Sequence, residues 1–164
     1  MTPAQLATLK AYILADPILA PKTSGDGTDY GFISDALSAP KSPAKLAWRT
    51  NVQPNEADDA PDYSVFDGFT QGKRDSWGFF LRAQRDYTRQ KTRKWVTDVW
   101  GAAAAGSNAE AILLAGTENA TVAEVAIGGT DRTTGSVTAL QRNYIGGVSL
   151  SEVAGMFNAQ RLAG

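Results

Sequence analysis

Apolar residues recur at intervals of three or four through much of the first 127 residues, which is the spacing typical of amphipathic helices. The first such repeat places three apolar side chains on one face: Leu6, Leu9 and Ile13. Thr2 and Gln5 precede it as a capping box, and Asp16-Pro17 ends it, because a residue before proline disfavours the α region. The pattern predicts a helix over residues 3–15, and we expect no signal peptide ahead of it.

Similar signals predict further short helices along the chain. They comprise an apolar face with Asp29 as its cap, two aromatic-rich segments in the middle of the chain, and three capping boxes that begin at Ser107, Thr121 and Ser149. The predicted helices cover residues 30–38, 70–84, 86–101, the segments after residues 107 and 121, and the C-terminal residues 149–164. We expect the two aromatic-rich helices to form an antiparallel pair.

The pattern changes at residues 128–148, where Gly, Thr and Ser dominate and apolar residues alternate with polar ones. This alternation predicts an extended arm or a β-hairpin. Because the segment carries few large apolar side chains, we expect it to be loosely held until the protein assembles with a partner.

Together these patterns predict a mainly α fold, a bundle of about four to six short helices with the extended segment near its end. The predicted organisation is a helical domain over residues 1–127, the extended arm over 128–148, and a C-terminal helix over 149–164. That helix would pack on the domain or on a neighbouring subunit. A chain of 164 residues is long enough to bury a sizeable core.

Composition narrows the possible functions. The chain has no cysteine and no histidine, which excludes disulfides and thiolate metal sites and removes the commonest general base. We therefore expect that the protein is not an enzyme and that it binds no cofactor or metal ion. Asp58, Asp59 and Asp62 lack the regular spacing of a calcium loop and indicate a solvated acidic loop. No apolar run reaches the roughly 18 residues that span a membrane, so we expect no membrane contact.

Charge is unevenly distributed although the net charge is only −1. Residues 70–94 hold 8 basic and 2 acidic side chains, between segments that are net acidic. The basic residues are Lys73, Arg74, Arg82, Arg85, Arg89, Lys91, Arg93 and Lys94.

The spacing of Arg82, Arg85 and Arg89 would place them on one face if that helix is continuous. Such a face could pair with an acidic protein surface, contact DNA phosphates, or simply be solvated. If it pairs with a protein, replacing these three arginines with glutamine should impair assembly and leave folding intact.

Aromatic residues supply a second set of candidates. Trp77 and Trp95 repeat at helical spacing with other apolar residues, which favours the core. Trp48 and Trp100 lie near segment ends beside polar residues and are predicted interface anchors, since tryptophan is enriched at binding hot spots. Tyr144 and Phe157 complete the predicted anchors. Core packing stays the alternative for Trp48 and Trp100.

Two blocks in the first third of the chain resemble a known family. The opening M-T-P-A-Q-L-x-x-L-K with its A-D-P ending, and the later S-P-A at residues 42–44 with W-R-T at 48–50 and Val52, are similar to small structural proteins of bacteriophage head-gene clusters. The resemblance implies a head-to-tail adaptor (connector) of a short-tailed phage.

Several expectations follow from the resemblance. It implies a ring of twelve copies below the portal protein that continues the DNA channel, with passing contact to packaged DNA, and that docks the tail (nozzle) protein. The protein would be assembled in the host cytoplasm and reside at the head–tail junction of the virion. Two alternatives stay open: a capsid decoration or cement protein, and a small DNA-binding protein.

Overall fold

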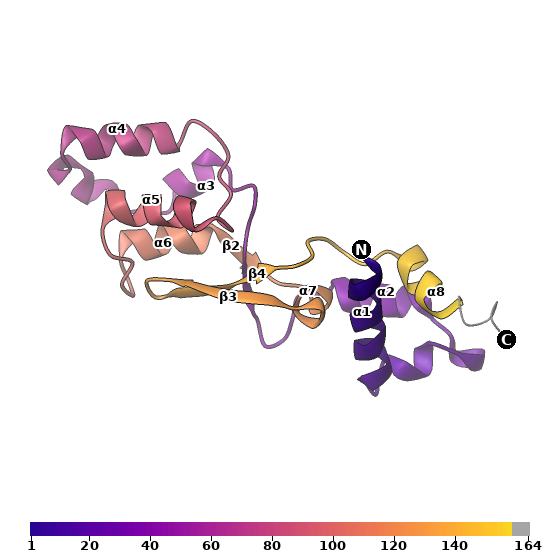
Figure 1. Ribbon diagram of the computed structural model, residues 1–164. Helices are drawn as coiled ribbons and strands as arrows, with labels where there is room; N and C mark the ends of the chain where they lie inside the picture. Colours follow the sequence, from indigo (N-terminus) through magenta and orange to yellow (C-terminus); the bar gives the residue numbers. More distant parts are fainter. Residues whose placement is uncertain (159–164) are drawn as a thin grey trace. The chain divides into compact units, whose positions relative to one another are not determined.

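The computed structural model describes residues 1–158 (Figure 1). Its helices are α1 (Pro3–Ala15), α2 (Tyr30–Ser38), α3 (Pro54–Asp58), α4 (Gln71–Phe80), α5 (Gln90–Trp100), α6 (Asn108–Ala115), α7 (Val122–Ile127) and α8 (Leu150–Asn158), with 3₁₀ turns η1 (Ala20–Lys22), η2 (Gly25–Gly27) and η3 (Tyr63–Gly68). Its strands are β1 (Leu46–Trp48), β2 (Thr117–Asn119), β3 (Gly129–Thr134) and β4 (Val137–Arg142).

The predicted mainly α bundle is wrong, because the strands form a four-stranded mixed sheet in an α/β fold. The helices expected at residues 3–15 and 30–38 are present as α1 and α2, with the capping box at Thr2 and the cap at Asp29. The β-hairpin expected within residues 128–148 is present as β3 and β4. The other two strands were missed because β1 and β2 have three residues each, too few to show an alternating pattern.

The strand order in the sheet is β2-β1-β4-β3. β1 runs parallel to β4, with Ala47 opposite Leu140. β3 and β4 form a hairpin through Gly135, which has φ 61° and lies so close to Ala103 that an added Cβ would be 2.2 Å from its carbonyl oxygen. The segment thus has the hairpin form of the two that the sequence predicts, and β4 is an interior strand of the sheet.

The chain divides into two compact units, and their boundaries differ from the predicted segments 1–127, 128–148 and 149–164. The terminal unit comprises Met1–Lys45, Asn119–Gly129 and Arg142–Gly164. The inserted unit comprises Leu46–Glu118 and Thr130–Gln141. Within the predicted C-terminal helix, α8 ends at Asn158, and residues 159–164 lie outside the described part of the chain.

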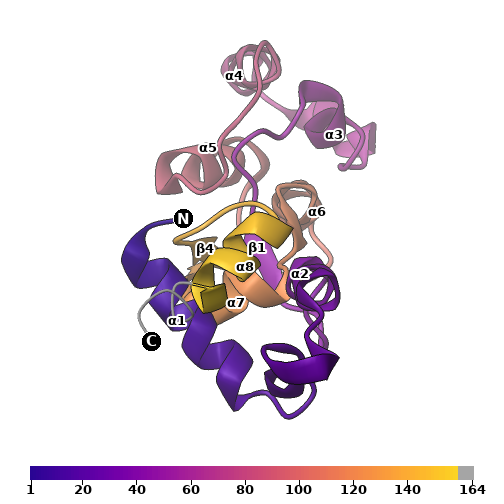
Figure 2. The same ribbon diagram turned by 90° about the vertical axis from the view of Figure 1, so that its right-hand side faces the viewer.

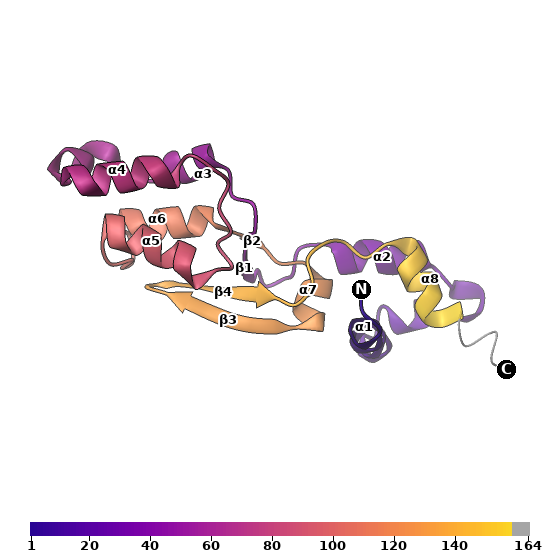
Figure 3. The same cartoon turned by 45° about the horizontal axis from the view of Figure 1, so that its top comes forward.

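The inserted unit holds an aromatic core. α5 and α6 lie side by side over the β3–β4 hairpin, as Figures 1 and 3 both show. Trp77, Phe80 and Tyr87 are fully buried there together with Val96 and Ile112. The core position predicted for Trp77 is confirmed, whereas Trp95 is only partly buried against this cluster.

The terminal unit has a separate aliphatic core in which α1, α2, α7 and α8 pack together (Figure 2). Leu9, Ile13 and Ile33 are fully buried in it. A buried ion pair joins Arg142 to Glu124 at 2.9 Å.

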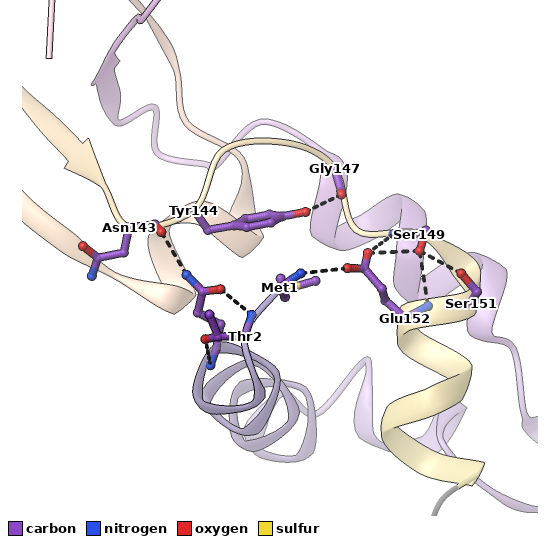
Figure 4. Close-up of polar contacts among 9 residues, drawn as sticks. Met1, Thr2, Asn143, Tyr144, Gly147, Ser149, Ser151 and Glu152 are labelled. Carbon is purple, nitrogen blue, oxygen red and sulfur yellow. Dashed lines mark hydrogen bonds and ion pairs between the residues drawn. The ribbon is translucent and has the colours of Figure 1, made fainter.

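The start of the chain is fastened within this unit (Figure 4). The Met1 amine lies 3.4 Å from a carboxylate oxygen of Glu152, whose other oxygen accepts hydrogen bonds from Ser149 at the beginning of α8. Gln5 donates to the carbonyl of Asn143 at 2.9 Å. These bonds connect the beginning of α1 with the first turn of α8 and with the segment that precedes α8.

Candidate functional site

The predicted basic face does not exist as one helical surface. α4 ends at Phe80 and α5 begins only at Gln90, so Arg82, Arg85 and Arg89 lie at or between the helix ends. The segment between α4 and α5 is not helical. Its residue Arg85 forms two main-chain hydrogen bonds with Val52, one through its amide and one through its carbonyl. The three-and-four spacing was therefore uninformative in this segment.

Three of the predicted site arginines are bound to main-chain carbonyl groups of their own unit. Arg74 donates to the carbonyls of Phe69 at 3.1 Å and Asp67 at 2.6 Å. Arg85 donates to Phe80 and Phe79, both at 2.7 Å, which are carbonyls at the end of α4. A cation at a helix C-terminus is favourable because the carbonyl dipoles point toward it.

Arg93 is the third, and it is only 2% exposed. It was predicted to face a partner or DNA, and its burial in the inserted unit corrects that expectation. Its guanidinium donates to the carbonyls of Tyr87 and Thr88 and to the Thr134 hydroxyl, and it lies 4.8 Å from the Trp48 ring centre. Burial is the main cause that lowers the pKa of Arg93, followed by the charge of Arg132.

The remaining predicted cations lie nearer to solvent. Arg82, Arg89, Lys91 and Lys94 are exposed and Lys73 is half-buried, with its ammonium 5.1 Å from the Phe69 ring centre. Arg89 pairs with Asp86 at 3.0 Å, and Lys94 pairs with Asp98 at 2.5 Å. Exposed pairs of this kind contribute little to stability.

A surface that combines aromatic rings and cations lies where α4 and α5 meet. Phe79 is 54% exposed and its ring stacks on Trp95, with centres 5.8 Å apart. The Arg82 guanidinium lies 5.5 Å from the Phe79 ring centre, and that of Arg85 lies 5.0 Å from the Trp95 ring centre. We call Phe79, Arg82, Arg85 and Trp95 the Phe79 surface. It is the best candidate for an interaction site.

Sequence reasoning found the arginines of this surface but missed Phe79. The available signal was the Phe79-Phe80 pair inside a helix, because two adjacent helical residues cannot both face the same core. Phe80 is buried against Trp77, and Phe79 is consequently turned outward.

Two of the four predicted interface anchors are core residues. Trp48 is 0% exposed in the inserted unit, and its indole donates to the Arg132 carbonyl at 3.1 Å. Phe157 is buried in the terminal unit, where it stacks on Tyr30. Neither side chain is accessible to a partner, so the prediction for these two is corrected.

The other two anchors are half-buried. Trp100 packs edge-on against Tyr63, Phe69 and Trp77. Tyr144 donates its hydroxyl proton to the Gly147 carbonyl at 2.7 Å. Both side chains have intramolecular contacts that account for their placement.

Carboxylates of the acidic loop accept hydrogen bonds from residues close to them in the sequence. The Tyr63 hydroxyl donates to Asp58, and Asp62 accepts from the amide and hydroxyl of Ser64 at the start of η3. The Ser64 hydrogen bonds lower the pKa of Asp62. Across residues 1–158, no group of three or more His, Cys, Asp or Glu side chains could hold a metal ion.

Comparisons with known proteins add no relative. No family model, curated protein sequence or solved structure matches the chain. Within the described residues, no helix has both the length and the apolar character needed to cross a membrane.

Proposed function

We propose that the protein is a structural component of a phage virion, a head-to-tail adaptor that forms a ring below the portal and docks the tail. The phage assignment rests on the resemblance of the two blocks in the first third of the chain. The observation that carries an assembly role is the Phe79 surface, because it presents a large aromatic ring to solvent beside two arginines.

Such a surface is suited to protein contact. Aromatic residues and arginine are enriched at binding hot spots, where an apolar body is buried and a charged group orients the partner. The ring of Phe79 already has its stacking partner in Trp95, so little side-chain freedom is lost on binding.

A second copy of the chain offers a complementary surface. Four exposed carboxylates lie between the last residue of α3 and the start of α4 in the inserted unit: Asp58, Asp59, Asp62 and Asp67. A contact between the Phe79 surface of one copy and this acidic segment of the next joins two different surfaces. Such head-to-tail contacts form a ring when the rotation from copy to copy closes on itself. The number of twelve copies comes from the resemblance.

The test uses a double variant, Phe79→Ser with Arg82→Gln, mixed with the portal ring of the parent phage. Sedimentation and negative-stain images should show wild-type rings on the portal and only single copies of the variant. Leu114→Ser, which alters an exposed apolar residue in α6 of the same unit, should assemble like the wild type. Normal assembly of the double variant would refute the role of the Phe79 surface.

The alternatives predict different partners. A cement protein would bind capsid shells that lack a portal, and a DNA-binding protein would bind duplex DNA with an affinity that falls steeply as salt increases. Binding to shells alone, or salt-sensitive DNA binding without portal binding, would replace the adaptor assignment.

A further inference from the structure

A polar pocket of about 490 Å³ lies in the inserted unit between the start of α5 and the β3–β4 hairpin. Arg89 and Arg93 contribute to its wall from the α5 side, and Arg132 contributes from β3. Asp131 is the carboxylate of the lining, and Thr88 and Gln141 add uncharged polar groups. Three arginines therefore line the pocket together with one aspartate.

Arg93 is held rigidly in this wall. Its Nη1 donates to two carbonyls, Tyr87 at 2.5 Å and Thr88 at 2.8 Å, and its Nε donates to the Thr134 hydroxyl at 3.0 Å. All three acceptors are uncharged. The carboxylate of Asp86 raises the pKa of Arg93, but less than burial and Arg132 lower it, and Asp86 forms its ion pair with Arg89 at 3.0 Å. The charge of Arg93 is therefore only partly compensated, and such a buried charge is costly to the folded protein.

Arg132 adds a second positive charge beside it. Its Nε donates to the Gln141 side chain at 3.2 Å, again an uncharged acceptor. The charge of Arg132, after burial, lowers the pKa of Arg93, so the two guanidinium groups repel each other. An anion between them would relieve this repulsion.

The beginning of α5 favours an anion at the same place. No side chain caps this helix, and its first turn contains no acidic residue. The main-chain amides at a helix N-terminus carry partial positive charge and bind phosphate well when basic side chains stand beside them.

We infer that this pocket binds a phosphate dianion, either free or as the terminal phosphate of a small ester. A phosphate presents several acceptor oxygens in a tetrahedral arrangement, which suits donors that converge from α5 and from the hairpin. The buried position of Arg93 favours a small ligand over duplex DNA, whose phosphates are fixed on a wide backbone. This inference is independent of the adaptor role.

Isothermal titration of the full chain with inorganic phosphate, adenosine 5′-monophosphate and adenosine tests it. Phosphate and the monophosphate should bind at one site and adenosine should not. Tighter binding of the monophosphate than of phosphate would identify an ester as the ligand, and the reverse order would identify free phosphate.

Arg132→Gln should weaken phosphate binding by about tenfold or more, since it removes a charge-assisted contact at the pocket. Arg132→Lys should retain part of the affinity. Arg82→Gln, the same chemical change on the Phe79 surface, should bind like the wild type. Thermal melts of all three variants check folding.

Three results would overturn the inference: no phosphate binding by the wild type, an unchanged affinity in a folded Arg132→Gln variant, or binding of duplex DNA alone. Loss of ring assembly with phosphate binding intact would refute only the adaptor proposal.

Discussion

Gly116, directly after α6, leaves no space for a side chain. A Cβ there would lie 2.0 Å from Cδ1 of the buried Tyr87 ring, although the backbone with φ −77° would accept any residue. We expect Gly116→Ala to lower the free energy of unfolding by about 1–3 kcal/mol, the usual effect of overpacking a core. Urea denaturation at neutral pH measures this difference.

Gly78 supplies the matched control, because a Cβ at this position in α4 would meet nothing within 4 Å. Gly78→Ala should raise stability by about 0.5–1 kcal/mol, since alanine loses less backbone entropy in a helix. Equal effects of the two substitutions would show that the contact with Tyr87 does not determine the outcome.

Glu56 should contribute to the acid sensitivity of the fold. Arg49 donates to both of its carboxylate oxygens, at 2.7 and 3.1 Å, and this hydrogen bonding is the main cause that lowers the pKa of Glu56 from 4.5. Because the folded pKa is lower, its stabilising contribution is complete above about pH 4.5 and is lost as the pH falls through the folded value.

We therefore expect Glu56→Gln to be less stable than the wild type at pH 7 and to converge with it at low pH. Thermal melts between pH 7 and pH 3 measure the convergence. Asp59→Asn, an exposed change nearby, should leave the difference from the wild type small at both ends of the range. A constant gap between Glu56→Gln and the wild type would contradict the ion-pair explanation.

Residue type alone did not reveal which candidates are buried. Arg93 precedes Val96 by three positions and Trp100 by seven, so it lies on the face of α5 that packs inward. The helical spacing that identified the core residues therefore also predicts an inward position for Arg93. We expected an exposed side chain instead, because Arg93 belongs to a segment rich in basic residues.

At the scale of elements, the Arg85 side chain stabilises the C-terminal end of α4. Its guanidinium binds two terminal carbonyls and lies 5.0 Å from the ring centres of Phe80 and Trp95. Arg85→Gln should lower the free energy of unfolding by about 1–2 kcal/mol, since hydrogen bonds to a charged group are among the stronger ones and this side chain is half-buried. Urea denaturation measures the loss.

This revises the expectation that replacing Arg82, Arg85 and Arg89 with glutamine leaves folding intact. The free energy of unfolding of Arg82→Gln and of Arg89→Gln should lie within about 0.5 kcal/mol of the wild-type value, because both side chains are exposed. A variant with all three substitutions would be less stable because of Arg85→Gln, so a loss of assembly could not be separated from a loss of folding. If Arg85→Gln alone melts like the wild type, its bonds to α4 carry little energy.

Helix starts were predictable because their signals are local. The Thr2–Gln5 and Thr121–Glu124 capping boxes form with both reciprocal bonds, and Gly128 ends α7 with φ 84°. The short strands β1 and β2 were not predictable in the same way. β1 is defined by its partner β4 far along the chain, and three residues contain no pattern that identifies such a pairing.

For the whole molecule, the main consequence of the fold is that neither unit is contiguous in sequence. A fragment of residues 46–118 lacks β4, which supplies the buried side chains of Val137 and Ala139 to the inserted unit. We expect this fragment to show poorly dispersed amide signals in nuclear magnetic resonance spectra and no cooperative melt. A fragment of residues 46–141 includes β4 and should regain both, whereas cooperative unfolding of 46–118 alone would contradict the need for the hairpin.

The parallel pairing of β1 with β4 also constrains the order of events during synthesis. β1 leaves the ribosome when its sheet partner has not yet been translated, and the core of the terminal unit awaits Val153 and Met156 in the same way. Nascent chains would therefore carry capped helices without a closed core until β4 and α8 have been translated. Since contacts between distant segments slow folding, we expect each core to close only after its last segment, β4 or α8, has left the ribosome.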